Sequence, residues 1–598
     1  MKRVLALLLA LTMVFALCAC GAKEAAPGNA PAAAEAGAPE TAEGAPAASA
    51  GPVYGGHATI YYQNFNEVFD PAMSESYTYS LWLEGLWAPD WSINDPSVYN
   101  FDANVLPLDY IAGQIADSWN WVVNGDGTSD LFVTIRDDVY FQQKDGEYDV
   151  FGGRKLTAED VKFSYDRLFS GDGDASAEMA LYGINWSSVF TGVFDFSKEI
   201  VEVTGDNELV FHIASEAEAV LEILMTTQVN ITGVEWDTLS EEQQNDWHYA
   251  CGTGPYALVG YEPDSYYKYE RNANYYDHDE RYPENQLPYL DSLTLTAVSD
   301  AAAIQSAFIA GNLDYISMDA NVSNDQYQQI IDNVDAVQIL HYDSNAAGIA
   351  LKVNQAPFDD IRVRIALQKA INLEEVNAAY YGYDTPLNLA CMWLEARPEW
   401  SSKANWSDEL KAEYSYDPEG AKDLLAEAGY PNGFSFTCVL NPNADQDLYQ
   451  LIKSYLAAIN VTMELEPVSD MMECNNISGN ADDPRMINQN IADLEGIDSA
   501  IFMYGSTGFA NPIHHSNTDF DAVLNEASAA MTTEETAAKA QEADAIFMSS
   551  HWVIACSGTT LKTELLSSRI GGLENGERIS YASFTRPFLA RIWAVDGQ

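Results

Sequence analysis

The chain has 598 residues, 47% of them hydrophobic, which is enough for a large core and more than one ordinary domain holds. It carries 29 Lys and Arg against 90 Asp and Glu, and the resulting net charge of −61 excludes nucleic acid as a partner because phosphates would be repelled. A disordered acidic chain would not carry its 34 Tyr, 23 Phe and 13 Trp, so the acids indicate a solubilising surface around a folded core.

The N-terminus has the pattern of a secretory signal. Lys2 and Arg3 precede an apolar run over residues 4–19, which is too short for a comfortable membrane span. Residues 21–52 are almost entirely Ala, Gly, Pro and Glu without a periodic apolar face, which is typical of a flexible tether. We therefore expect an exported body that begins near residue 53.

Between the signal and the tether, Leu17-Cys18-Ala19-Cys20-Gly21 resembles a bacterial lipobox. The resemblance implies that Cys20 becomes the lipidated first residue of the mature chain, with residues 1–19 removed. Acyl chains contribute roughly 0.8 kcal/mol per buried CH₂, so a multiply acylated cysteine holds a protein firmly to a membrane. Ordinary cleavage near Cys20 without a lipid is the alternative.

The first half of the body mixes strand and helix signals. Residues 58–62 and 131–135 have the short β-type patterns of strands. Thr157-Ala-Glu-Asp160 resembles a capping box and predicts that a helix starts there. Residues 252–256 predict a turn, and residues 266–270 predict the strand after it.

The second half adds two helices. Residues 362–377 place their apolar side chains on one face, which predicts one continuous helix. Asp417 and Pro418 begin a second helix as N-cap and first helical residue, and Gly429 ends it. No repeat of about 20–50 residues exists, so solenoids and propellers are excluded. The mixture indicates an α/β protein whose length suggests two lobes.

The cysteines of the body are widely spaced and odd in number. A disulfide framework would need closely patterned pairs, so we expect buried structural thiols. These residues are Cys251, Cys391, Cys438, Cys474 and Cys556.

Six segments between residues 69 and 434 form an ordered set of motifs. They are Phe69-Asp-Pro-Ala72, Lys155-Leu-Thr-Ala-Glu-Asp-Val-Lys-Phe-Ser164, Cys251-Gly-Thr-Gly-Pro-Tyr256 with Arg271-Asn-Ala-Asn-Tyr275, Ala307-Phe-Ile-Ala-Gly-Asn-Leu-Asp314, residues 357–370 and residues 416–434. In this order they resemble the large oligopeptide-, dipeptide- and nickel-type solute-binding proteins of bacterial ABC importers (family 5). Each segment alone is moderately specific, and the ordered set is highly specific for the fold.

The resemblance implies an α/β, two-lobed periplasmic-binding-protein type II fold, with an extra subdomain in lobe one and a ligand cleft between the lobes. Lobe one is expected at about 53–299 and 556–598, and lobe two at about 300–555, joined by two crossover strands. Hinge closure would bury the ligand, and the closed form is what a transporter recognises.

The function implied is that of an extracytoplasmic lipoprotein that captures oligopeptides and presents them to the transmembrane subunits of an ABC permease. It implies a monomer with no catalysis, no cofactor and no metal. Oligosaccharide, to which the abundant aromatic residues are suited, and a metal chelate are alternative ligands, and presentation of the ligand to a receptor is an alternative role.

Ligand residues follow from the same resemblance. One strand edge that pairs with a peptide follows the early Asp-Pro segment and places Ser76 and Tyr77 near the ligand. The family's Trp-x-x-Asp-Tyr pattern, whose Asp binds the peptide amine, is absent here. Glu495 stands at the corresponding point, flanked by Asp493 and Asp498, and any of these carboxylates could neutralise an ammonium. Ordinary surface acids are the alternative.

Enzyme and metal motifs are weak. Ser265 and Lys268 match Ser-x-x-Lys but fall in a predicted strand, whereas that chemistry needs a helix start, so a secreted hydrolase is the unfavoured class. His514 and His515 are adjacent, and adjacent side chains seldom converge on one metal, so surface or turn histidines are expected.

Overall fold

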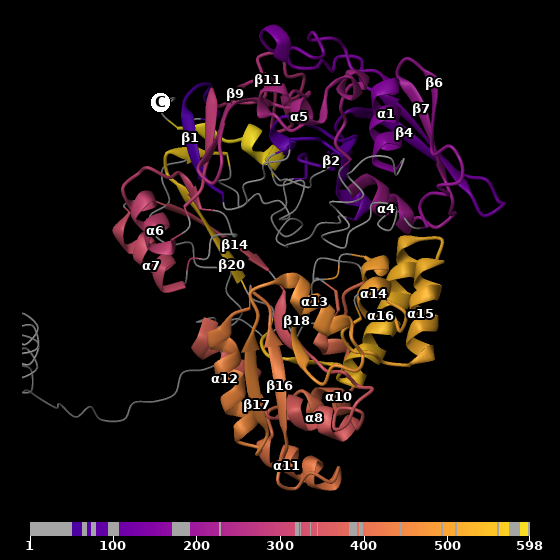
Figure 1. Ribbon diagram of the computed structural model, residues 1–598, viewed down its shortest axis with the longest axis vertical. Coiled ribbons are helices and arrows are strands. Elements are labelled where there is room, and N and C mark those ends of the chain that lie inside the picture. Colours follow the sequence, from indigo (N-terminus) through magenta and orange to yellow (C-terminus); the bar gives the residue numbers. More distant parts are fainter. Residues whose placement is uncertain are drawn as a thin grey trace, which may run out of the picture. The chain divides into compact units, whose positions relative to one another are not determined.

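In the residues that the computed structural model describes, the strands form three sheets of four or more strands, together with shorter pairs (Figure 1). It describes residues 51–62, 69–72, 79–93, 107–169, 190, 192–226, 229–298, 300–316, 322, 324–334, 337–343, 345–381, 392–393, 399–442, 444–491, 494, 496–508, 511–558, 561–572 and 586–595. We call the body of the seven- and four-stranded sheets lobe one and the body of the five-stranded sheet lobe two.

A seven-stranded mixed sheet forms the centre of lobe one. Its strands, in spatial order, are β14 (Val337–Asp343), β20 (Leu561–Ser567), β13 (Tyr315–Ile316), β1 (His57–Tyr61), β12 (Ser292–Thr296), β9 (Tyr266–Arg271) and β8 (Tyr256–Glu262). The strands expected at 58–62 and 266–270 are confirmed as β1 and β9. Tyr267 and Tyr269 of β9 are buried while their neighbours are not, the period-2 pattern of a sheet with one buried face. Helices α6 (Ala301–Ile309) and α7 (Asn324–Asn333) follow β12 and β13.

A four-stranded antiparallel sheet forms the extra subdomain of lobe one. It consists of β4 (Ala116–Val123), β5 (Ser129–Ile135), β7 (Glu208–Ile213) and β6 (Val201–Gly205), with α1 (Ala158–Phe169), α4 (Ala219–Thr226) and α5 (Glu241–Gln244) in the connections. Leu131, Val133 and Ile135 of β5 point into its core, as the alternation predicted. Three two-stranded pairs complete the lobe: β2 (Trp87–Pro89) with β3 (Ile111–Gly113), β10 (His278–Asp279) with β11 (Tyr282–Gln286), and β21 (Ile570–Gly571) with β22 (Trp593–Ala594).

The capping motif at 157–160 has a structural role. The Asp160 carboxylate accepts hydrogen bonds from the backbone N–H and the hydroxyl of Thr157, which begins α1 as expected. The same buried carboxylate pairs with the Arg154 guanidinium at 2.8 and 2.6 Å, and Arg154 in turn pairs with Glu235. The motif therefore ties the start of α1 to the loop before α5.

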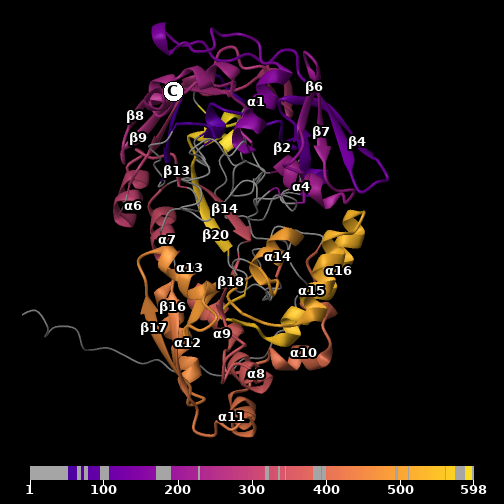
Figure 2. The ribbon, with the colours of Figure 1, turned by 45° about the vertical axis from the view of Figure 1, so that its right-hand side comes forward.

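A five-stranded sheet forms the centre of lobe two. Its order is β17 (Thr462–Pro467), β16 (Ser435–Leu440), β18 (Met486–Ile491), β15 (Ala346–Ala350) and β19 (Val553–Ala555). The helices around it are α8 (Ile361–Lys369), α9 (Leu373–Val376), α10 (Asp408–Glu413), α11 (Pro418–Glu427), α12 (Gln446–Ala457), α13 (Met471–Gly479), α14 (Ile497–Tyr504), α15 (Thr518–Ser528) and α16 (Thr533–Ser550) (Figure 2).

Of the two predicted helices in this lobe, one is confirmed and one is corrected. The Asp417 side chain accepts the Gly420 N–H at the start of α11, and Gly429 has φ +95° just beyond its end. The continuous helix expected over 362–377 is wrong, because α8 ends at Lys369. Asn372 stops it by accepting the Glu375 N–H and capping the separate α9.

The lobes are joined by two chain crossings, from β14 to β15 and from β19 to β20. β14 and β20 pair antiparallel from Val337–Ser567 to Asp343–Leu561, well beyond the two residues that pair β20 with β13. We call this pair the crossing ribbon. The sequence-based boundary at 299/300 falls between β12 and α6, so β13 and β14 lie after it and still belong to the sheet of lobe one.

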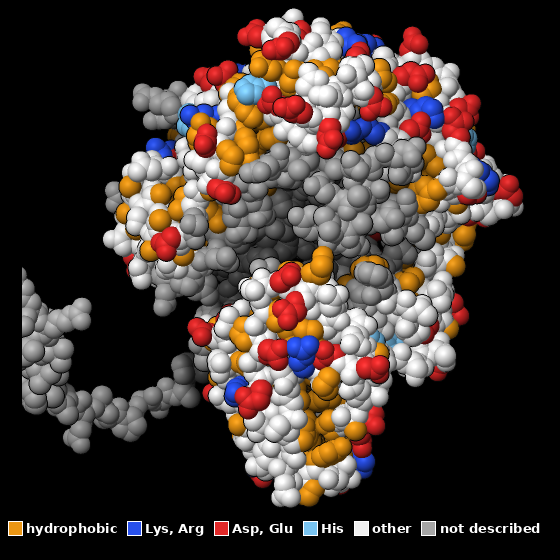
Figure 3. Space-filling model, viewed as in Figure 1, with side chains coloured by type: hydrophobic (Ala, Val, Ile, Leu, Met, Phe, Trp, Pro, Cys, Tyr) orange, Lys and Arg blue, Asp and Glu red, His pale blue; other side chains and the backbone are white. Residues whose placement is uncertain are grey.

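Cysteine burial and surface charge match the expectations. Cys251, Cys438, Cys474 and Cys556 are buried free thiols, while Cys391 lies outside the described residues. On the face shown in Figure 3, acidic side chains are scattered among neutral ones rather than gathered in one place. None of the helices in the described part of the chain has the length and apolar character needed to span a bilayer.

Candidate functional site

The strands of lobe two end together at one edge of their sheet. β16, β17 and β18 are mutually parallel, and β19 runs in the same direction because both β18 and β19 are antiparallel to β15. Their carboxyl ends therefore share the edge at which β15 begins. In α/β sheets, this is the edge where ligands bind.

Lobe one has an equivalent edge. β1 is parallel to β12 and β13, and β14 is parallel to β13 because both are antiparallel to β20. The carboxyl ends of these four strands lie where the crossing ribbon leaves the sheet. Only residues 344–345 and 556–560 separate the ribbon from β15 and β19, so both crossings connect one carboxyl edge to the other. We take these two edges as the candidate site.

The side chains of the ligand residues predicted from sequence fall outside the described part of the chain. Ser76 and Tyr77 fall within 73–78, and Asp493 and Glu495 lie just after β18. Asp498 belongs to the first turn of α14, and the position of its side chain is outside the described part. Cys20 is likewise outside it. These five ligand residues and the lipid site stay predictions, and the structure describes what holds the chain on either side of them.

In lobe one, both flanks of 73–78 are fixed. Before it, the buried Asp70 carboxylate receives two bonds of 2.5 Å from the Arg167 guanidinium of α1 and a third from the Ala72 N–H. After it, Leu81 and Trp82 are fully buried in the core of the large sheet. The segment that is expected to contact the ligand is thus held at each end.

The Cys251–Tyr256 motif explains how the second flank is held. The Gly254 N–H donates to the Trp82 carbonyl at 3.0 Å. A Cβ atom on Gly252 would lie 2.1 Å from that same carbonyl oxygen, so a side chain is excluded there. The glycines permit this backbone-to-backbone contact, and the motif thereby fixes the chain at Trp82.

In lobe two, the chain after β18 is held between the sheet and a helix. Ile491 pairs with Ala346, and the Leu494 N–H donates to the Met392 carbonyl at 3.1 Å. The Met392 N–H in turn donates to the fully buried carboxyl of Asp544 on α16 at 2.9 Å. Burial raises the pKa of Asp544 to about 7. The acidic stretch that is expected to bind an amine thus leaves the sheet at its carboxyl edge.

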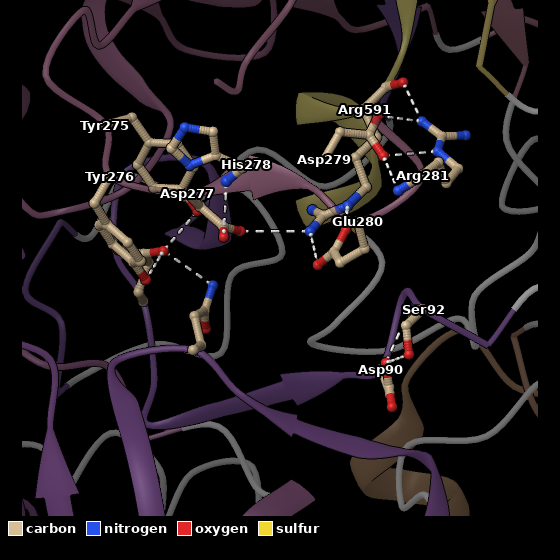
Figure 4. A network of polar contacts seen from close by, with 12 residues as sticks. Asp90, Ser92, Tyr275, Tyr276, Asp277, His278, Asp279, Glu280, Arg281 and Arg591 are labelled. Carbon is tan, nitrogen blue, oxygen red and sulfur yellow. Dashed lines mark hydrogen bonds and ion pairs between the residues drawn. The ribbon is translucent and has the colours of Figure 1, made fainter. Parts of the chain in front are cut away.

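Glu84, two positions after Trp82, has a second buried carboxyl group. The Glu84 side chain accepts hydrogen bonds from Tyr275 and Tyr276 at 2.8 and 3.0 Å and from Gln114 at 3.1 Å; Figure 4 shows the two tyrosines side by side. Burial raises the pKa of Glu84 to about 7. No motif in the sequence singled out Glu84 or Asp544, because an acid's burial depends on the tertiary fold.

The raised pKa of Glu84 predicts that the stability of the protein depends on pH. Its pKa is higher in the folded state than the usual 4.5, so between these values the folded protein keeps a proton that the unfolded chain releases. The free energy of unfolding should therefore fall by about 3 kcal/mol as pH rises from about 4.5 to 7. In Glu84→Gln, whose side chain is neutral at every pH, the free energy of unfolding measured in urea should fall less steeply as pH rises. An unchanged slope would contradict the assignment, and Glu419→Gln, at an exposed position, is the control.

The C-terminal segment is fixed to lobe one by a charge network. Arg591 is only 3% exposed, and its guanidinium pairs with Glu280 at 2.7 Å and Asp277 at 3.4 Å (Figure 4). The same guanidinium covers the Trp91 ring at 4.6 Å. Arg281, paired with Asp279, donates to the Arg591 carbonyl. Ala590, Ile592 and Trp593 beside it pack into the cores of lobe one.

Metal and catalytic motifs are not assembled. His514 has φ +55° and its Nε2 contacts the Ser478 carbonyl, but His515 is buried and stacks on Trp552, which corrects the expectation of a surface or turn side chain. Within the described part of the chain, no three His, Cys, Asp or Glu side chains are grouped so that they could hold a metal. Ser265 precedes β9 and Lys268 lies within it, so neither residue stands at the start of a helix, as the Ser-x-x-Lys chemistry would need.

Residues 111–511 match the family model of bacterial extracellular solute-binding proteins, family 5. This match covers more than half of the chain. The chain belongs to family 5. The six sequence segments that resembled this family are thereby explained, and the two-lobed type II binding-protein fold agrees with the solved structures of similar proteins.

Curated family 5 relatives match over part of their length. Heme-binding protein A of Haemophilus influenzae is 29% identical over 49% of this chain and 52% of its own. The glutathione-binding protein GsiB of Pectobacterium atrosepticum is 30% identical over 36% of this chain and 38% of its own. The matched region thus spans about half or less of each relative.

Solved structures match over almost the whole chain. The protein AppA from Clostridium difficile gives a TM-score of 0.70 at 14% identity, covering 90% of this chain and 100% of that one. The Helicobacter pylori protein DppA, in complex with the peptide STSA, gives 0.65 at 17% identity, covering 91% and 98%. At these identities, the structural similarity shows the fold alone.

Proposed function

We propose that this family 5 protein captures a peptide-like ligand between the carboxyl edges of its two sheets and presents it to the transmembrane subunits of an ABC importer. The topology carries this proposal: both crossings join one carboxyl edge to the other, so a ligand held there contacts both lobes. Similar structures hold the peptide STSA and the dipeptide Met-Leu, which supports a peptide.

The residues proposed to contact the ligand are Ser76 and Tyr77 from lobe one and Asp493, Glu495 and Asp498 from lobe two. A peptide offers main-chain groups for strand-edge pairing and a cationic amine for the carboxylates. Ligand capture makes and breaks no covalent bond, so no catalytic residue is assigned. We also propose that Cys20 carries the lipid and that residues 21–52 tether a monomeric body to the outer face of the membrane.

Closure around a ligand needs two bodies, and the strand order suggests where they divide. We propose that lobe one comprises residues 53–343 and 561–598 and that lobe two comprises residues 346–555. Each change of lobe then falls at a short connection beside the crossing ribbon. This proposal moves residues 300–343 from lobe two, where the sequence placed them, to lobe one.

The test is thermal stabilisation of the purified protein by ligand panels: short peptides, glutathione, heme, opines, glycans and divalent metals. A ligand at 100 times its dissociation constant should raise the free energy of unfolding by about 2.7 kcal/mol, because it binds the folded state alone. We expect peptides to stabilise, and the triple variant Asp493→Asn/Glu495→Gln/Asp498→Asn to lose the effect.

The matched control is Asp423→Asn/Glu427→Gln/Asp482→Asn, which makes the same charge change at exposed positions of lobe two and should keep the stabilisation. Stabilisation by glycans or heme alone would retain a binding protein and reject the peptide ligand. An equal loss of stabilisation in the two triple variants would reject the proposed carboxylates.

A further inference from the structure

A side chain of lobe one bonds to a helix start of lobe two. The Glu218 carboxylate, just before α4, accepts hydrogen bonds from the backbone N–H and the hydroxyl of Thr533 at 3.2 and 3.3 Å. Thr533 is the first residue of α16, an 18-residue helix. Glu218 and Thr533 are 315 positions apart in the chain, and both are half-buried.

The chemistry favours a carboxylate at this point. The first N–H groups of a helix have no partner within it, and the helix N-terminus carries partial positive charge. The Thr532 hydroxyl already accepts the Glu535 N–H as the N-cap. Glu218 takes the N–H of Thr533 in addition, so lobe one supplies a hydrogen-bond acceptor that α16 does not provide for itself.

Both ends of this contact are held within their own lobes. On the lobe one side, Ala217 and Val220 are buried, and the Glu216 carboxylate accepts the Gly127 N–H at 2.9 Å. On the lobe two side, Thr536 and Ala540 of α16 are buried. Because each partner is anchored in its own lobe, separating the lobes would break this contact.

We propose that Glu218 is an interlobe latch, which stabilises the closed arrangement of the protein by capping α16 from the opposite lobe. This rests on the proposed function, in which closure encloses a ligand. The latch adds to the ligand's own effect on the open–closed equilibrium and lets the ligand-free protein populate the closed form. Without the latch, ligand binding alone would favour the closed form over the open form.

The test measures the distance between the lobes in the ligand-free full chain. Spin labels on unnatural amino acids replace Lys198 of lobe one and Glu419 of lobe two, whose side chains are 68% and 81% exposed, so native cysteines stay intact. Double electron–electron resonance then gives the ratio of the short-distance to the long-distance population. In the unsubstituted background the short-distance population should be substantial.

Two variants remove the contact from opposite sides. Glu218→Ala removes the acceptor. Thr533→Pro removes both donors and suits the first position of a helix, and Thr532, with φ −131° and ψ 154°, already has the conformation required before proline. Each variant should lower the closed-to-open ratio at least about tenfold, the order expected for hydrogen bonds to a charged acceptor. Circular dichroism should show helix content unchanged.

Glu216→Ala is the matched control, since it removes a carboxylate two positions away whose partner lies in the same lobe, and its ratio should equal that of the unsubstituted protein. An unchanged ratio in either Glu218→Ala or Thr533→Pro, or an equal loss in the control, overturns the latch. Thermal stabilisation by ligand tests the proposed function separately. If ligands stabilise the protein but the lobe distance does not respond to Glu218→Ala, only the latch is rejected. If no ligand stabilises the protein but the lobe distance does respond, only the proposed function is rejected.

Discussion

Replacing Arg591 by Ala should lower the free energy of unfolding by about 3 kcal/mol, because the buried guanidinium bonds two carboxylates that are themselves only partly buried. The loss leaves the Glu280 and Asp277 carboxylates without their guanidinium and removes the cation that covers the Trp91 ring. Urea unfolding followed by tryptophan fluorescence would measure the change.

Arg591→Lys retains the charge but not the planar fork of donors, so its stability should lie between those of the unsubstituted protein and Arg591→Ala. Lys198→Ala breaks an ion pair with Asp195 whose Lys side chain is 68% exposed, and should change stability by less than about 1 kcal/mol. An Arg591→Ala protein as stable as the Lys198→Ala control would show that the C-terminal segment is not fixed by this network.

Gly252→Ala should have the second large effect, because the added Cβ meets the Trp82 carbonyl oxygen at 2.1 Å and backbone has to move. Such overpacking costs about 2–3 kcal/mol. The displaced chain leads directly into residues 73–78, so we also expect weaker stabilisation by whichever ligand the thermal panels identify. Unfolding in urea and ligand titration measure the two effects separately.

Gly479→Ala provides the comparison, because a Cβ there meets nothing within 4 Å and the residue ends α13. Its stability and ligand response should match those of the unsubstituted protein. If Gly252→Ala behaved in the same way, close contact between the Cys251–Tyr256 motif and Trp82 would be disproved, and the motif would need another explanation.

Local signals in the sequence predicted much of the fold. The strands at 131–135 and 266–270, the start of α1 at Thr157 and the Asp417-capped α11 all have patterns that act within a few residues. The expected helix over 362–377 was wrong because its apolar periodicity continues past Asn372, while the side chain of Asn372 caps a new helix. Apolar periodicity indicates which face of a helix is buried, but it does not indicate where the helix ends.

The candidate site was predictable only through the resemblance to family 5. The stretch around Glu495 lacks the expected Trp and Asp, so no local pattern marks it, and the crossing ribbon that identifies the ligand edge pairs residues more than 200 positions apart. Glu84, Asp544 and Arg591 gave no signal for a related reason. Each is an ordinary charged residue in sequence, and only long-range packing buries it.

The position of β20 determines when each lobe can be completed during synthesis. β20 lies between β14 and β13 in the sheet of lobe one, although it begins at residue 561. The five strands of lobe two all lie between residues 346 and 555. A chain that emerges N-terminus first therefore has every strand of lobe two available while the sheet of lobe one still has an open edge. Until β20 is synthesised, this unpaired strand edge can form hydrogen bonds with strands of other chains. A chain truncated before residue 561 should therefore depend on chaperones or aggregate.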